Sequence, residues 1–251
     1  MSKRIDDLGI NDLKIVQDTD YFCFGMDSVL LANFVNPKVK KNVVLDLCSG
    51  SGVIPVIISA KKECGKIIAV ELQEKMYELL EENILKNNLS EKIIPFKCDV
   101  KDYKNIATKI KEITNTGTVD IVVCNPPYKK CGSGIKNPND IKTIARHEVL
   151  CSLEDIFITA SKLLNTKGKL YLVHKPERLV DLLSISRKYK LEAKNITFIQ
   201  PTKDMKPSIV LIEYVKNGGN EVLVQKNIIE YNDDGSYTDE IYKIYGIKKE
   251  E

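Results

Sequence analysis

Short β-branched runs alternate with helix-length amphipathic segments through most of the chain, and this alternation strongly limits the possible folds. Strands are predicted at 43–47, 66–71, 92–97, 119–124, 169–174, 195–200 and 208–215, and helices at 52–62, 74–88, 102–113, 152–164 and 177–188. Strands that are separated by helices form a parallel sheet covered on both faces. No helix separates the last two strands, so we expect them to pair antiparallel at one edge. The sequence therefore predicts an α/β fold with a seven-stranded, mostly parallel sheet.

The length and composition predict one main domain. The 251 residues are 43% hydrophobic and 29% charged, which are ordinary globular proportions. We divide the chain into an N-terminal extension at 1–41, a core at 42–216 and a C-terminal tail at 217–251. The tail is predicted to form a hairpin or loop followed by a short helix.

Charge, cysteine content and hydropathy argue against several classes of protein. The net charge of +3 is too small to indicate a polyanionic partner by itself. The seven cysteines form no C-x-x-C pair, which favours reduced thiols in a cytoplasmic protein. The apolar stretch 22–35 is interrupted by Asp27 and is shorter than the roughly 20 residues that a bilayer requires, so no membrane partner is expected. No spacing of ligand residues indicates a metal site.

A glycine-bearing turn, LDLCSGSGVIP at 45–55, connects the first predicted strand of the sheet to the following helix. Gly50 and Gly52 allow the backbone to approach a ligand closely. Glu71 ends the next strand, 21 positions after Gly50, where a carboxylate can accept hydrogen bonds from a ribose diol. The turn therefore predicts a site for a nucleotide-like ligand.

The same turn argues against a dinucleotide. A dehydrogenase turn of the type G-x-G-x-x-G would have glycine where this chain has Pro55. Asp46 precedes the glycines and would repel a pyrophosphate, whereas a cationic ligand suits its carboxylate. We therefore expect a nucleoside ligand that carries positive charge.

Four segments in this order, VLDLCSGSG, AVE, KCDV and NPPY, resemble the class I S-adenosylmethionine-dependent methyltransferases over about residues 20–215. The resemblance implies a Rossmann-like fold with an antiparallel edge strand, and S-adenosylmethionine as the cofactor. It implies that the turn at 46–52 holds the methionine and adenosine of the cofactor, Glu71 its ribose hydroxyls and Asp99 its adenine amino group. Cys48 stands where many members have the first glycine of the loop.

The NPPY segment at 125–128 follows the fourth strand and predicts an acceptor site for an exocyclic amine. Such an amine is a poor nucleophile because its lone pair is delocalised into the ring. The side-chain carbonyl of Asn125 and the backbone carbonyl of Pro126 can accept hydrogen bonds from the two amine protons and aim the lone pair at the cofactor. Asn125 is therefore expected beside both the cofactor and the substrate amine. Pro126 and Pro127 hold these acceptors still. The ring of Tyr128 offers a stacking surface for an extruded base, and its hydroxyl is not expected to be needed.

NPPY also resembles enzymes that methylate glutamine side-chain amides in proteins. Those enzymes usually have a helical recognition domain before the glycine loop, whereas 42 residues precede the first core strand here. The segment YFCFGMDSVLLANF at 21–34 instead resembles the bacterial tRNA1(Val) adenine-37 N6-methyltransferase family, as does ARHEVL at 145–150. In that family a helix that begins after the glycine packs over the methionine end of the cofactor. This implies that Gly25 makes the turn and that Asp27 lies at the cofactor, with Asp27 or Ser28 as the helix cap.

A basic segment follows NPPY. Between Lys129 and His147 there are five basic residues and one acidic residue. Such a loop suits the phosphate backbone of RNA, with Lys129, Lys130 and Arg146 as the expected contacts. Of the two histidines, His174 ends a strand and is predicted to be structural, whereas the role of His147 stays open.

The sequence therefore predicts a methyltransferase that uses S-adenosylmethionine to methylate the exocyclic N6 of an adenine in RNA, with tRNA as the favoured substrate. A protein glutamine N5-methyltransferase is the first alternative. The second is a non-catalytic RNA-binding module on the same fold. The presence of both Asn125 and Tyr128 argues against that module.

Overall fold

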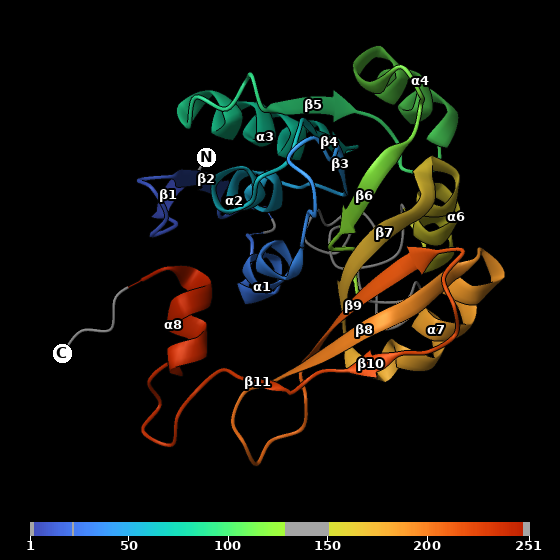
Figure 1. Ribbon diagram of the computed structural model, residues 1–251. Helices are drawn as coiled ribbons and strands as arrows, with labels where there is room; N and C mark the ends of the chain where they lie inside the picture. The colour runs from blue at the N-terminus through green and yellow to red at the C-terminus, as the bar shows by residue number, and fades with distance from the viewer. Residues whose placement is uncertain (1–2, 22, 129–150, 248–251) are drawn as a thin grey trace.

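The computed structural model describes residues 3–21, 23–128 and 151–247. Its centre is a nine-stranded sheet with the strand order β10-β8-β9-β7-β6-β3-β4-β5, in which β11 pairs with β8 (Figure 1). The strands of this sheet are Val44–Leu47 (β3), Ile67–Glu71 (β4), Ile93–Lys97 (β5), Val119–Cys124 (β6), Leu164–His174 (β7), Leu191–Gln200 (β8), Ile209–Lys216 (β9), Leu223–Val224 (β10) and Ile228–Ile229 (β11). The α-helices of the described residues are Met26–Phe34 (α1), Val53–Lys61 (α2), Glu74–Lys86 (α3), Tyr103–Thr114 (α4), Leu153–Leu163 (α6), Leu179–Lys188 (α7) and Asp239–Tyr245 (α8).

The predicted arrangement of the sheet is confirmed. β5, β4, β3, β6 and β7 pair in parallel, in that order. β9 runs antiparallel to both β7 and β8 and lies between them. The last two predicted strands therefore pair antiparallel, as the missing helix between them indicated. β7 and β8 begin at Leu164 and Leu191, earlier than predicted, and the two-residue strands β10 and β11 extend the seven predicted strands.

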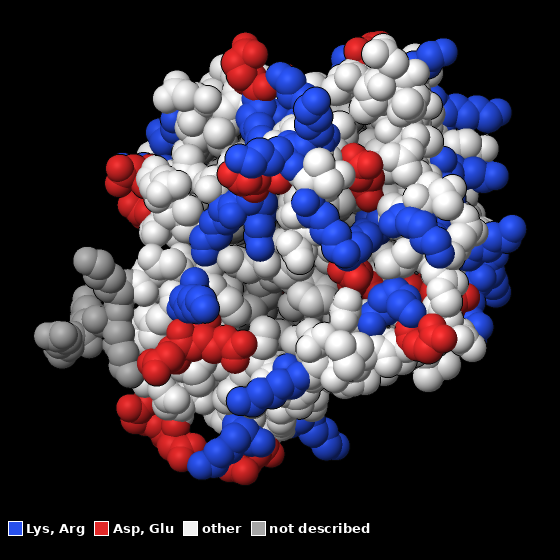
Figure 2. Space-filling view, in the orientation of Figure 1, with Lys and Arg blue, Asp and Glu red and all other residues white. Residues whose placement is uncertain are grey.

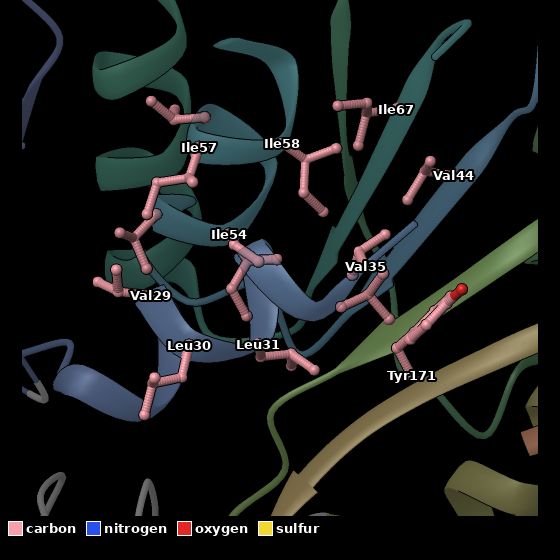
Figure 3. Close-up of a cluster of buried hydrophobic side chains, with 14 of the residues drawn as sticks. Val29, Leu30, Leu31, Val35, Val44, Ile54, Ile57, Ile58, Ile67 and Tyr171 are labelled. Carbon is pink, nitrogen blue, oxygen red and sulfur yellow. The ribbon is translucent and has the colours of Figure 1, made fainter. Parts of the chain in front are cut away.

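The sheet separates two hydrophobic cores. Successive side chains of a strand point to opposite faces of the sheet. All residues of β3 and β4 are buried, so both faces are covered there. Helices α1, α2, α3 and α8 cover one face, and α4, α6 and α7 cover the other. Figure 3 shows the first core, where side chains of α1 and α2 pack against Val44, Ile67 and Tyr171. This burial on both faces explains why the strands are continuous β-branched runs.

The N-terminal extension contains a β-hairpin that the sequence did not predict. β1 (Lys3–Asp7) and β2 (Lys14–Asp18) form a separate two-stranded antiparallel sheet. β2 packs against α3, outside the central sheet. The hairpin therefore lies beside α3, the helix that follows β4.

The C-terminal tail returns to the N-terminal part of the chain. α8 packs against α1, and its Ile241 enters the same core as α1. Lys61 of α2 donates hydrogen bonds to Asn33 Oδ1 of α1, at 3.1 Å, and to the backbone carbonyl of Ile244 in α8. Within the described residues, no helix combines the length and hydropathy that crossing a membrane would require.

Candidate active site

A pocket of about 500 Å³ opens at the carboxyl ends of β3, β4 and β6. Parallel strands present their carboxyl ends at one edge of the sheet, and ligands of such folds bind there. The glycine loop, Glu71, Asp99 and the NPPY segment all contribute to the pocket wall. The structure thus brings together four features that the sequence predicted separately.

The glycine loop follows β3 and has an unusual backbone conformation. Gly50 has a φ of +56° and Gly52 a φ of +85°, both in the left-handed region. A Cβ atom on Gly52 would also lie 2.5 Å from Cδ1 of Leu80 in α3, so a larger residue would strain the backbone and displace this side chain. Cys48 has a φ of +60°, which shows that the position where glycine is common keeps the left-handed conformation with a side chain.

Asp46 lies behind the glycine loop, and its side chain is not part of the pocket wall. It is fully buried, and neither carboxylate oxygen has a hydrogen-bond partner among the described residues. Burial raises the pKa of Asp46 to about 8. A buried carboxylate without a partner favours a cationic donor nearby, which fits the charged ligand expected from the sequence.

Glu71 ties the glycine loop to the end of β4. One carboxylate oxygen accepts a hydrogen bond from the Gly50 backbone N–H at 2.8 Å. The other accepts from the N–H groups of Leu72 and Gln73, at 2.9 and 2.8 Å. Burial raises the pKa of Glu71, and these three N–H groups act in the opposite direction. Because a carboxylate has about four acceptor positions, capacity remains for a hydroxyl group in the pocket.

Asp99 lies in the pocket wall after β5, next to Val100 and Cys151. Its Oδ1 accepts a hydrogen bond from the Lys101 backbone N–H at 2.9 Å, and its Oδ2 is 3.4 Å from the Lys101 ammonium. The carboxylate can still accept a hydrogen bond from an amino group in the pocket. This place suits the adenine contact that the family resemblance implies.

The start of α1 differs from the prediction. The N-cap residue is Gly25, so no side chain caps the helix, and the helix begins at Met26. Asp27 and Ser28 lie inside the first turn, so neither is the cap; instead the Asp27 carboxylate accepts from the Ser28 N–H at 2.8 Å. Asp27 and Ser28 contribute to the pocket wall, whereas Gly25 does not. A Cβ on Gly25 would lie 3.1 Å from the Asp27 carboxylate, so a larger residue there would require a small shift of Asp27.

Side-chain hydrogen bonds connect NPPY to this first turn of α1. Asn125 Nδ2 donates to Ser28 Oγ at 2.9 Å. The Tyr128 hydroxyl lies 2.5 Å from Asp27 Oδ2 and 2.6 Å from Asn125 Oδ1, so one phenol proton is shared between two acceptors. Burial, and then the charge of Asp27, raises the pKa of Tyr128 well above its ordinary value. The hydroxyl that sequence analysis left without a role therefore holds Asn125 and α1 together.

The ring of Tyr128 packs against the end of β7. It lies edge-on to His174, with 5.1 Å between ring centroids, and the Lys175 ammonium is 5.6 Å from its centroid. His174 is fully buried, and burial lowers its pKa to about 4, which fits the predicted structural role. Lys175, which was not predicted as a site residue, is exposed and lines the pocket. Its place directly after a parallel strand beside β6 was the signal that could have found it.

Three predicted substrate contacts, Lys129, Lys130 and Arg146, lie outside the described residues, as do ARHEVL at 145–150 and His147. Figure 2 shows lysine and arginine side chains over much of the face drawn in Figure 1, with acidic side chains among them. Within the described ranges, no group of histidine, cysteine, aspartate and glutamate side chains could hold a metal ion.

The chain is similar to curated proteins named tRNA1(Val) (adenine(37)-N6)-methyltransferase. The protein of that name from Porphyromonas gingivalis is 25% identical over 193 residues, which cover 76% of this chain and 73% of the relative. The one from Haemophilus influenzae is 27% identical over 232 residues, which cover 92% of each chain. The similarity therefore extends well beyond the NPPY and glycine-loop motifs.

The fold is that of the class I methyltransferases. A crystal structure described as a predicted O-methyltransferase from Agrobacterium tumefaciens matches with a TM-score of 0.69 at 18% identity, over 88% of this chain and 96% of that one. The family described as conserved hypothetical protein 95 matches residues 26–179, a range that includes the glycine loop, Glu71, Asp99 and NPPY. On this match, the chain belongs to the conserved hypothetical protein 95 family.

Proposed function

We propose that this protein is an S-adenosylmethionine-dependent methyltransferase that modifies the exocyclic N6 of an adenine in RNA, and that the RNA is a tRNA. The observation that carries the proposal is the position of Asn125 and Tyr128 in the wall of the same pocket as the glycine loop and Glu71. A site for a planar amine therefore opens into a site for a nucleoside cofactor. Named relatives that modify an adenine of tRNA support the choice of substrate.

The residues present fit S-adenosylmethionine. The buried carboxylate of Asp46 lies behind the pocket wall, so we propose that it favours the positively charged methionine portion without contacting it. Glu71 and Asp99 both line the pocket, and we propose that Glu71 accepts a hydrogen bond from a ribose hydroxyl and Asp99 one from the adenine amino group. The loop residues Cys48 to Ser51 line the pocket around the remaining part of the cofactor, with Asp27 of α1 as the cover, whereas Gly52 does not line it. The bound cofactor supplies an electrophilic methyl group on a positively charged sulfur.

The chain's own part in the reaction is to orient the amine. Asn125 Oδ1 has two lone pairs, one of which faces the Tyr128 hydroxyl, so the other can accept a hydrogen bond from the substrate amine. The backbone carbonyl of Pro126 is the second acceptor, because Pro126 also lines the pocket. Two fixed acceptors leave the nitrogen lone pair pointing away from them, toward the cofactor site. The product amine can lose its proton to water, so no general base is required.

RNA is proposed to approach the NPPY side of the pocket. Lys175, which is exposed next to Tyr128, is a described basic residue at this opening. We propose that Lys129, Lys130 and Arg146 contact RNA phosphates from the segment that follows NPPY, which positions the RNA without selecting its sequence. A tRNA substrate also agrees with the cytoplasmic location expected from the sequence.

The test of this function is methyl transfer to unmodified tRNA. The purified protein, labelled S-adenosylmethionine and tRNA should yield N6-methyladenosine after digestion to nucleosides. Asn125→Ala should lower the transfer rate roughly a hundredfold or more, because one positioned acceptor stabilises the transition state by about 3 kcal/mol. Cofactor affinity, measured by calorimetry, should change little in this variant.

Two outcomes would contradict the proposal. Label in a glutamine side chain of a protein, with none in tRNA, would favour the glutamine N5-methyltransferase. Full activity of Asn125→Ala would show that the NPPY amide does not orient the amine.

A further inference from the structure

Two asparagines of α3 hold the N-terminal hairpin. Asn87 accepts from the Lys14 backbone N–H at 2.9 Å and donates to the Lys14 carbonyl at 2.8 Å. Asn83 accepts from the Val16 N–H at 2.7 Å and donates to the Val16 carbonyl at 3.0 Å. Four residues along a helix span about 6.0 Å and two residues along a strand about 6.6 Å, so the two amides match alternate residues of β2. Two side chains of α3 therefore form hydrogen bonds to alternate residues of β2, as the backbone of a neighbouring strand would.

The two side-chain amides differ in the acceptor of their second N–H proton. Asn87 donates it to the backbone carbonyl of Asn83, within the same helix, at 2.7 Å. Asn83 donates it to the backbone carbonyl of Ser51, in the glycine loop, at 2.9 Å. Asn83 is fully buried and makes all three bonds to backbone groups outside its own helix. One amide thus connects the hairpin, α3 and the glycine loop.

The Ser51 carbonyl belongs to the part of the glycine loop that lines the pocket. Ser51 is buried, lines the pocket and lies between Gly50 and Gly52, which both have positive φ. Glu71 fixes the loop on one side through the Gly50 N–H. On the other side, Asn83 fixes the next carbonyl. Gly50 and Gly52 have access to many backbone conformations, so contacts such as these hold the loop in the observed one.

We propose that Asn83 is a positioning residue that sets the glycine loop for cofactor binding and couples the loop to the N-terminal hairpin. The Asn83 side-chain amide is planar, so one orientation of this group must satisfy its three hydrogen bonds. If β2 moves, the amide turns with it and its hydrogen bond to the Ser51 carbonyl is misaligned. Coupling between two sites is reciprocal: if the docked hairpin favours cofactor binding, bound cofactor favours the docked hairpin. The proposal rests on the proposed function for the identity of the cofactor.

The first test compares Asn83→Ala with Asn87→Ala. Each variant loses two hydrogen bonds to β2 and is expected to lower the melting temperature, but only Asn83→Ala loses the bond to the loop. The dissociation constant for S-adenosylhomocysteine, measured by calorimetry, should rise roughly tenfold or more in Asn83→Ala and stay within about twofold in Asn87→Ala. Equal dissociation constants in the two variants would overturn the proposal.

The second test uses the unaltered protein, so it decides the matter even if Asn83→Ala does not fold. Saturating S-adenosylhomocysteine should slow hydrogen exchange of the Val16 amide more than that of the Lys14 amide, which Asn87 holds. Equal slowing of both amides would indicate general stabilisation and overturn the coupling. If the unaltered protein binds no S-adenosylhomocysteine, the proposed function fails together with this inference. Binding without the difference between the amides overturns the inference alone.

Discussion

Tyr128→Phe separates the role of the hydroxyl from that of the ring. The variant keeps the ring that stacks on a base and loses the group that lies between Asp27 and Asn125. If Tyr128 served only for stacking, its hydroxyl would be dispensable, as the sequence suggested. The contacts in the structure instead predict slower methyl transfer, because Asn125 Oδ1 loses a neighbour that fixes its orientation.

The magnitude follows from the partners and their exposure. Hydrogen bonds to charged groups contribute about 1.5–3 kcal/mol when buried. Tyr128 and Asp27 are both partly exposed, so the low end of this range applies. A loss of about 1.5 kcal/mol corresponds to a rate roughly tenfold lower. The pKa of Tyr128 is raised well above its ordinary value, so the phenol keeps its proton and the effect should not depend on pH near neutrality.

The assay is single-turnover methyl transfer with tRNA and S-adenosylmethionine both saturating, which removes differences in binding. Tyr189→Phe is the matched control. It deletes a similar bond, from the Tyr189 hydroxyl to Glu154 at 2.7 Å, at α6 and α7 outside the pocket wall. Its rate should equal that of the unaltered protein. A Tyr128→Phe rate within about twofold of that control would refute the role given to the hydroxyl.

Two further predictions concern charge. Burial raises the folded-state pKa of Asp46 to about 8, above its ordinary value of 3.8. The ligand-free protein should therefore lose stability as pH rises from about 4 toward 8, and Asp46→Asn should flatten this loss in chemical unfolding; parallel curves would contradict it. Replacing Lys129, Lys130 and Arg146 together by alanine should weaken tRNA binding and its salt dependence while cofactor affinity stays constant. Filter binding across a salt series measures this, and an unchanged slope would count against it.

Local sequence was sufficient for the central sheet and for the presence of the ligand pocket. Continuous β-branched runs between helix-length segments identify the strands, and parallel strands necessarily bring their carboxyl ends, with Glu71 and Asn125, to one edge. The N-terminal hairpin could not be predicted in this way. Its partners are side-chain amides of Asn83 and Asn87, 67 and 73 positions along the chain, and no local pattern records such pairing.

The errors at the acceptor end of the pocket have the same cause. Asp27 has the residue type of a helix cap, but the helix begins one residue before it. Its more informative contact is the Tyr128 hydroxyl, 101 positions later. Residue type and spacing identified both side chains as part of the site. Only their positions in the fold show that the two act on each other.

The contact between α8 and α1 bears on the order in which the molecule is completed during its synthesis. Asp27 and Ser28 leave the ribosome early, whereas the residues of α8 that support their helix follow more than 200 positions later. The chain emerges from its N-terminal end, and a domain generally folds as a unit. The central strands and the glycine loop are thus available for pairing before α1 can gain its last neighbour. The acceptor end of the pocket is finished only after all of the sheet has been translated.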